Sequence, residues 1–127
     1  MLNEEQKHVF YPSLTIGEFL RTFCDELEVD GVSSSDIWSA ARYGFGLKGD
    51  DIDEFARRAI RALIAAGARP ARPTNVGPDF FIAEKGYDGQ AEDIAERIVT
   101  ESKELGHDPD HGWLWFYRFE ANRLAPR

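Results

Sequence analysis

The stretch that decides the fold is DDIDEFARRAIRALIAAG, residues 50–67. Its apolar residues recur at steps of three and four, so they share one face of an α-helix. Asp51 followed by Glu54 predicts a capping box at the start of this helix, and Gly67 predicts its left-handed end. We therefore predict a helix over 51–66, and we expect the other elements to pack on its apolar face. That face consists of Ile52, Phe55, Ala56, Ala59, Ile60, Leu63 and Ile64.

Three more segments have a helical pattern. Thr15 and Glu18 form another capping-box signature, and Ser33 or Ser34 is placed to cap a shorter helix. After that helix, Phe45 stands between two glycines that interrupt helical structure, and we expect its ring to anchor this loop in the core. The predicted helices cover roughly 15–29, 34–44 and 90–105, in addition to 51–66.

Residues 79–84 and 112–119 predict strands, because both are rich in aromatic and apolar side chains between turn residues. Residues 8–11 are a candidate third strand, or else a packed arm. Three prolines within 69–78 exclude a helix and favour extended backbone, so we interpret that segment as a connector. The expected fold class is α+β, with about four helices packed on a small antiparallel sheet in which 79–84 pairs with 112–119.

The length of 127 residues is enough for one domain with a core of its own. We expect a single domain over 1–127, with a helical half up to about residue 68 and a mixed half over 79–127. The formal charge of −8 disfavours binding to nucleic acid or to an anionic membrane. One cysteine, Cys24, excludes an intramolecular disulfide. No leader or spanning segment is recognisable, so we expect a protein of the cytoplasm with no membrane association.

A helix-turn-helix interpretation follows from the basic residues between 48 and 72. This stretch carries six basic and four acidic residues, net +2, so the remainder of the chain carries −10. Used as a recognition helix, 51–66 would present Arg57, Arg58 and Arg61 to DNA, and the later β-hairpin would form a wing. The acids at the start of the same helix would oppose phosphate contacts. A winged-helix-like DNA-binding regulator is therefore an alternative function and not the leading one.

A second alternative comes from the sequence His-Asp-Pro-Asp-His at 107–111. His107, Asp108, Asp110 and His111 are all side chains that bind zinc or other divalent ions, so a metal-dependent enzyme is conceivable. An Asp-Pro turn after a helix end explains the same residues without a metal. The chain has neither a nucleophile elbow nor a P-loop, and we predict no cofactor and no catalytic activity.

The end of the first predicted helix is crowded with acids, Asp25, Glu26, Glu28 and Asp30, where the helix dipole disfavours negative charge. These residues are candidates for contact with a basic protein. With the net charge, they favour a small acidic protein-binding module as the leading hypothesis. A bacterial immunity- or antitoxin-like role against a basic protein fits this charge through electrostatic steering. The identity of the partner and the oligomeric state are left open by the sequence.

Overall fold

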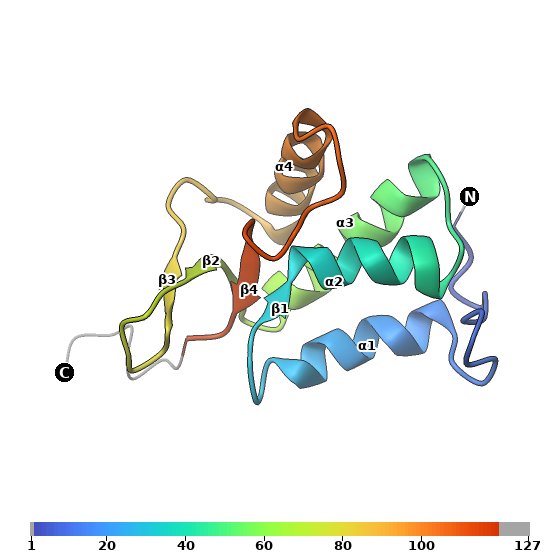
Figure 1. Ribbon diagram of the computed structural model, residues 1–127, viewed down its shortest axis with the longest axis horizontal. Helices are drawn as coiled ribbons and strands as arrows, with labels where there is room; N and C mark the ends of the chain where they lie inside the picture. The colour runs from blue at the N-terminus through green and yellow to red at the C-terminus, as the bar shows by residue number, and fades with distance from the viewer. Residues whose placement is uncertain (1, 120–127) are drawn as a thin grey trace.

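The computed structural model describes residues 2–119, and within them the chain has the predicted α+β fold (Figure 1). The helices are α1 (Ile16–Glu26), α2 (Ser34–Ser39), the π-helix η1 (Ala40–Gly44), α3 (Asp50–Ala65) and α4 (Ala91–Glu104). The strands are β1 (Val32–Ser33), β2 (Arg69–Pro73), β3 (Phe81–Ala83) and β4 (Trp115–Tyr117). Each of the four predicted helical segments is present, and α3 and α4 begin and end within one residue of the prediction.

Helix α3 is the centre of the helical layer, as its amphipathic pattern predicts. Its apolar face, from Ile52 to Leu63, is buried against α1, α2 and α4. In Figure 1, α1 and α4 lie at opposite sides of the molecule, with α2 and α3 between them. Phe116 and Leu114, which are fully buried, extend the same core to the sheet.

The starts of the helices show which capping signals are correct. Thr15 caps α1 and forms the predicted box with Glu18: its Oγ1 accepts from the Glu18 N–H at 3.2 Å. The capping box predicted from Asp51 is wrong, because α3 begins one residue earlier, at Asp50, and the N-cap is Gly49. Gly49 has φ +55°, a conformation that glycine adopts without a Cβ clash.

The sheet has the strand order β1-β4-β2-β3, and all its described pairs are antiparallel. Two predictions are wrong here. The segment 69–78 is not only a connector, because its first half is β2 and occupies the interior of the sheet. For the same reason β3 does not pair with β4; β2 lies between them. The β2–β3 hairpin extends away from the helices at the left of Figure 1.

The prolines of β2 are tolerated because of where they lie in the ladder. The Pro70 carbonyl accepts a hydrogen bond from the Glu84 N–H at 2.8 Å, so the Pro70 nitrogen also faces the side of β3. The ladder between β2 and β3 begins one residue later, at Ala71. Pro73 faces the other side, beyond the last residue of β2 that pairs with β4. Both prolines are paired with a neighbouring strand, Pro70 with β4 and Pro73 with β3, but each ring nitrogen faces the opposite side, where that residue has no described pair. Proline's extended backbone also suits the strand.

Other elements are shorter than predicted: α1 ends at Glu26 rather than 29, β3 covers only part of 79–84, and β4 only part of 112–119. Two further differences concern 8–11 and 34–44. Residues 8–11 form no strand; one isolated bridge, Lys7 to Thr15, holds this arm to the start of α1. The sequence predicts a single helix over 34–44, but the α-helix α2 ends at Ser39 and the π-helix η1 follows it. The hydrogen bond from the Phe45 N–H to the Ala40 carbonyl, at 2.9 Å, spans five residues, as is typical of a π-helix. Such π-turns are rare and frequently occur at functional sites.

Candidate functional site

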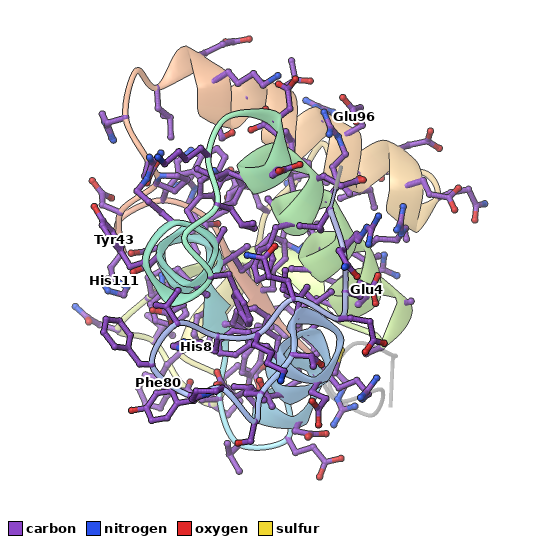
Figure 2. The ribbon with its side chains drawn as sticks, turned by 90° about the vertical axis from the view of Figure 1, so that its right-hand side faces the viewer. Glu4, His8, Tyr43, Phe80, Glu96 and His111 are labelled. Carbon is purple, nitrogen blue, oxygen red and sulfur yellow. The ribbon has the colours of Figure 1, made fainter. Side chains whose placement is uncertain are left out.

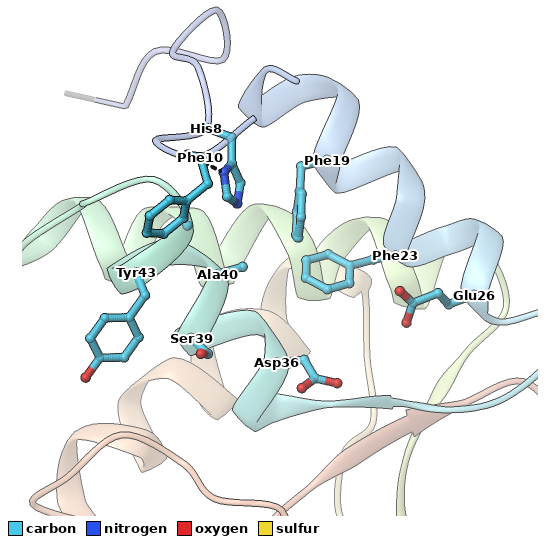
Figure 3. Close-up of a pocket in the computed structure, with 10 residues that line it drawn as sticks. His8, Phe10, Phe19, Phe23, Glu26, Asp36, Ser39, Ala40 and Tyr43 are labelled. Carbon is cyan, nitrogen blue, oxygen red and sulfur yellow. Dashed lines mark hydrogen bonds between the residues drawn. The ribbon is translucent and has the colours of Figure 1, made fainter. Parts of the chain in front are cut away.

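A cavity of about 410 Å³ lies between the N-terminal arm, α1 and the α2–η1 segment (Figure 3). His8 and Phe10 line it from the arm, and Phe19 and Phe23 from α1. Figure 3 shows two carboxylates at one end, Glu26 of α1 and Asp36 of α2. We call this cavity the aromatic groove: its walls are His8, Phe10, Phe19 and Phe23, and its acidic end is Glu26 with Asp36.

Hydrogen bonds to backbone carbonyl groups hold the arm against η1 and the residue after it, and so define the groove. Val9 N–H donates to the Gly44 carbonyl at 2.8 Å, and the Gln6 side chain donates to the Phe45 carbonyl at 2.8 Å. His8 N–H donates to the Leu14 carbonyl at 2.8 Å, which closes the loop before α1. The arm is therefore attached on both sides of His8.

The His8 ring is almost fully buried, with 9% of the residue exposed, and points into the groove (Figure 3). Its Nδ1 accepts from the backbone N–H groups of Phe10 and Tyr11, at 3.1 and 3.3 Å. An imidazole nitrogen that accepts from two donors carries no proton, so the neutral ring is protonated at Nε2. Nε2 lies directly over Gly44, where a Cβ would come within 2.8 Å of it.

Gly44 is therefore the residue that leaves room for the His8 ring. We expect Gly44→Ala to lower the free energy of unfolding by about 1–2 kcal/mol, since the ring is held at Nδ1 and has to shift. Urea denaturation and the His8 ring resonances in an NMR spectrum measure both effects. Gly17→Ala is the matched control: its Cβ would meet Glu4 only at 3.4 Å, and alanine stabilises a helix, so its expected effect has the opposite sign. Equal stability of the two variants would contradict this role of Gly44.

Aromatic packing supports the walls from below. Phe19 meets Phe23 and Phe45 edge to face, with centroids 5.0 and 5.5 Å apart, and His8 lies 5.1 Å from Phe45. Two of the aromatic residues that line the groove lie largely in solvent: Phe10 is 72% exposed and Tyr43 66%. Val9 and Tyr11, the neighbours of Phe10 in the chain, are exposed as well, so three consecutive apolar side chains of the arm lie in solvent.

The acidic end combines one expected residue with one that sequence reasoning missed. Partial burial, followed by the charges of Asp36 and Asp30, raises the pKa of Glu26. The other acids predicted at this helix end point elsewhere: Glu28 lies 3.9 Å from Arg118, and Asp30 accepts from the Gly31 N–H at 2.7 Å. Asp25 is exposed and does not line the groove. Asp36 gave no signal beyond that of an ordinary acid in the first turn of a helix.

The raised pKa of Glu26 makes a prediction about stability and pH. The folded state binds this proton more tightly than the unfolded state, so ionisation of Glu26 lowers stability as pH rises from about 4.3 through the raised folded value. We expect Glu26→Gln to increase the free energy of unfolding at pH 7, by about 0.5 kcal/mol or less for a partly exposed group. No such gain is expected at pH 3.5.

Denaturant unfolding at the two pH values measures this difference. Glu92→Gln is the control: Glu92 lies exposed in the first turn of α4, where its charge favours the helix dipole. A loss of stability in Glu26→Gln at pH 7 would show that the carboxylate is favourable in the free protein.

The arginines of the alternative DNA-binding interpretation are engaged within the molecule. Arg57 Nε lies 2.6 Å from Glu96 of α4, and Arg58 Nη1 lies 2.7 Å from Glu4 of the arm (Figure 2). The ion pair with Glu96 raises the pKa of Arg57. Of the three candidates, Arg61 alone has no ion pair within residues 2–119. Helix α3 thus presents no free row of three arginines.

The side chains of 107–111 turn toward different neighbours. Asp108 accepts from both Nε and Nη2 of Arg42, at 2.7 and 2.9 Å, and this pair raises the pKa of Arg42. Asp110 accepts from the Gly112 N–H at 2.9 Å, as in an ordinary turn.

The two histidines of this segment also lie apart. His107 Nδ1 lies 2.7 Å from the backbone carbonyl of the next residue, whereas His111 Nδ1 lies 3.2 Å from the Ser33 hydroxyl. Over the part of the chain that the structure describes, no three His, Cys, Asp or Glu side chains form a group that could hold a metal ion. The four side chains therefore do not converge on one point: Asp108 contacts Arg42 of η1, whereas His111 contacts Ser33 of β1.

Comparison with known proteins does not assign a function to the groove or a family to the chain. None of the helices within residues 2–119 has the length and apolar character needed to cross a membrane. The chain matches no protein-family model, and no curated protein or solved structure is detectably similar to it.

Proposed function

We propose that this protein acts by binding a basic protein partner at the aromatic groove and the exposed apolar side chains beside it. The observation that carries the proposal is the composition of the groove, with aromatic walls and the two carboxylates Glu26 and Asp36 at one end. Protein-binding surfaces are typically centred on aromatic side chains, and opposite charge steers and orients the partner. The exposed Phe10 and Tyr43 supply such aromatic side chains.

Two further observations support binding rather than structure alone. The acidic end carries a cost in the free protein, since burial and neighbouring charges raise the pKa of Glu26, and a cationic partner would remove that cost. The net charge of −8 provides long-range attraction for a basic partner. In the cell, this proposal corresponds to an immunity- or antitoxin-like role: the protein would bind a basic enzyme in the cytoplasm and mask it.

Affinity purification from the producing cells tests the proposal. We expect the wild-type protein to retain a basic protein at low salt and to lose it at high salt, because the contact between opposite charges is screened. The variant Glu26→Lys/Asp36→Lys should lose it at low salt. Glu92→Lys, which changes an exposed acid of α4 outside the groove, should retain it. Retention of the same proteins by all three forms would contradict the proposal.

A further inference from the structure

We infer that the aromatic groove takes one arginine side chain of the partner lengthwise, with its guanidinium between Glu26 and Asp36 and its backbone carbonyl at His8. This inference rests on the proposed function and specifies what enters the groove. It follows from three features that occur together: an acceptor pair at one end, apolar walls along the middle and a single unused donor at the other end.

The unused donor is Nε2 of His8. Both hydrogen bonds of this side chain are made by Nδ1, so Nε2–H has no partner within the described residues. No fully buried side-chain nitrogen or oxygen in that part of the chain lacks a partner, so Nε2 must be reached by solvent, and His8 lines the groove. A nearly buried N–H that faces a cavity favours a ligand with an acceptor there, such as a peptide carbonyl.

The acidic end of the groove favours binding of a cation. Glu26 and Asp36 come from different helices, and the charge of Asp36 is one of the causes that raise the pKa of Glu26 in the free protein. Neither has an ion pair among residues 2–119. A guanidinium has five donors in a planar arrangement, so it can bind two carboxylates at once, which an ammonium does with less directional fit.

The middle of the groove suits the rest of an arginine side chain. Phe10 is 72% exposed and Phe19 is partly exposed, so these two lining residues offer apolar surface to the three methylene groups. Phe23 is only 3% exposed, so it supports Phe19 from below, and the planar head is held mainly by the carboxylates. Figure 3 shows Phe23 next to Glu26 and above Asp36.

Short peptides titrated into the labelled wild-type protein test the inference by NMR. We expect acetyl-Ala-Arg-Ala-amide to shift signals of the groove residues and to bind about tenfold more tightly than its citrulline counterpart, which has the same shape without charge. The lysine counterpart should lie between them. Equal binding of the arginine and citrulline peptides, shifts confined to another surface, or no shifts at all would overturn the inference.

Variants assign the two ends separately. Glu26→Gln and Asp36→Asn should each weaken the arginine peptide severalfold, whereas Glu28→Gln, an adjacent acid outside the groove, should not. The Asn side chain of His8→Asn can keep an acceptor near the position of Nδ1 but has no donor at the position of Nε2. This variant should therefore bind the arginine peptide more weakly, and its affinity for ethylguanidinium, which has no carbonyl, should be unchanged. Equal effects of Glu26→Gln and Glu28→Gln would contradict the assignment of the acidic end. Should His8→Asn fail to fold, the comparison of arginine with citrulline on the wild type still decides the inference.

The outcome is distinguishable from that of the purification experiment. If a basic partner is lost from Glu26→Lys/Asp36→Lys but no arginine peptide binds, the partner uses this surface in another way and only the inference fails. If the variant keeps every protein that the wild type retains, the proposed function fails first.

Discussion

We expect Leu63→Asp to abolish cooperative unfolding of the protein. Leu63 is fully buried on the inner face of α3, in the last turns of the helix on which α1, α2 and α4 pack. The substitution removes the apolar side chain and places a carboxylate among apolar groups, with no cation to compensate it. We expect a loss of more than about 4 kcal/mol, which is comparable with the whole stability of many small domains.

Thermal denaturation followed by circular dichroism measures this effect. The matched control is Ala65→Asp, which adds the same carboxylate two residues later on the exposed side of α3. Its expected cost is about 1 kcal/mol or less, from the unfavourable helix dipole at a C-terminus. A cooperative transition in Leu63→Asp near that of the control would mean that α3 is not the centre of the core.

Helices were predictable because their evidence is local. A repeat of three and four residues identifies the buried face of α3 without knowledge of its neighbours, and Thr15 with Glu18 marks the start of α1. β2 was not predictable in this way. Its prolines argue against an interior strand, and they are tolerated only because of the register with β3 and β4, which the local sequence does not contain.

The residues of the groove likewise divide into those with a local sequence signal and those that only tertiary contacts bring together. Glu26 was a candidate because acids at a helix end are unusual, which is a local signal. Asp36 becomes important only when α2 brings it beside Glu26, and His8 only when the arm folds over Gly44. Binding sites built from several segments depend on tertiary contacts of this kind. Periodicity and charge in one sequence therefore identified a single member of the acidic end and none of the walls.

Phe45 connects the fold with the groove, and its removal is the second large effect we expect. Between its two glycines it is the predicted anchor of this loop, and the prediction is confirmed: 1% of the residue is exposed. Its ring lies 5.1 Å from His8, 5.5 Å from Phe19 and 5.8 Å from Phe55, so it contacts two walls of the groove and α3 at once.

We expect Phe45→Ala to lower the free energy of unfolding by about 3–5 kcal/mol, because it leaves a cavity among rings that cannot all collapse into it. Phe10→Ala is the control: that side chain is 72% exposed, and its loss should change stability by about 0.5 kcal/mol or less. Urea denaturation compares the two. Phe45→Leu should be less destabilised than Phe45→Ala, since leucine fills much of the volume of the ring. The leucine side chain would still present a different shape under His8. Equal midpoints for Phe45→Ala and Phe10→Ala would show that the groove does not depend on the core beneath it.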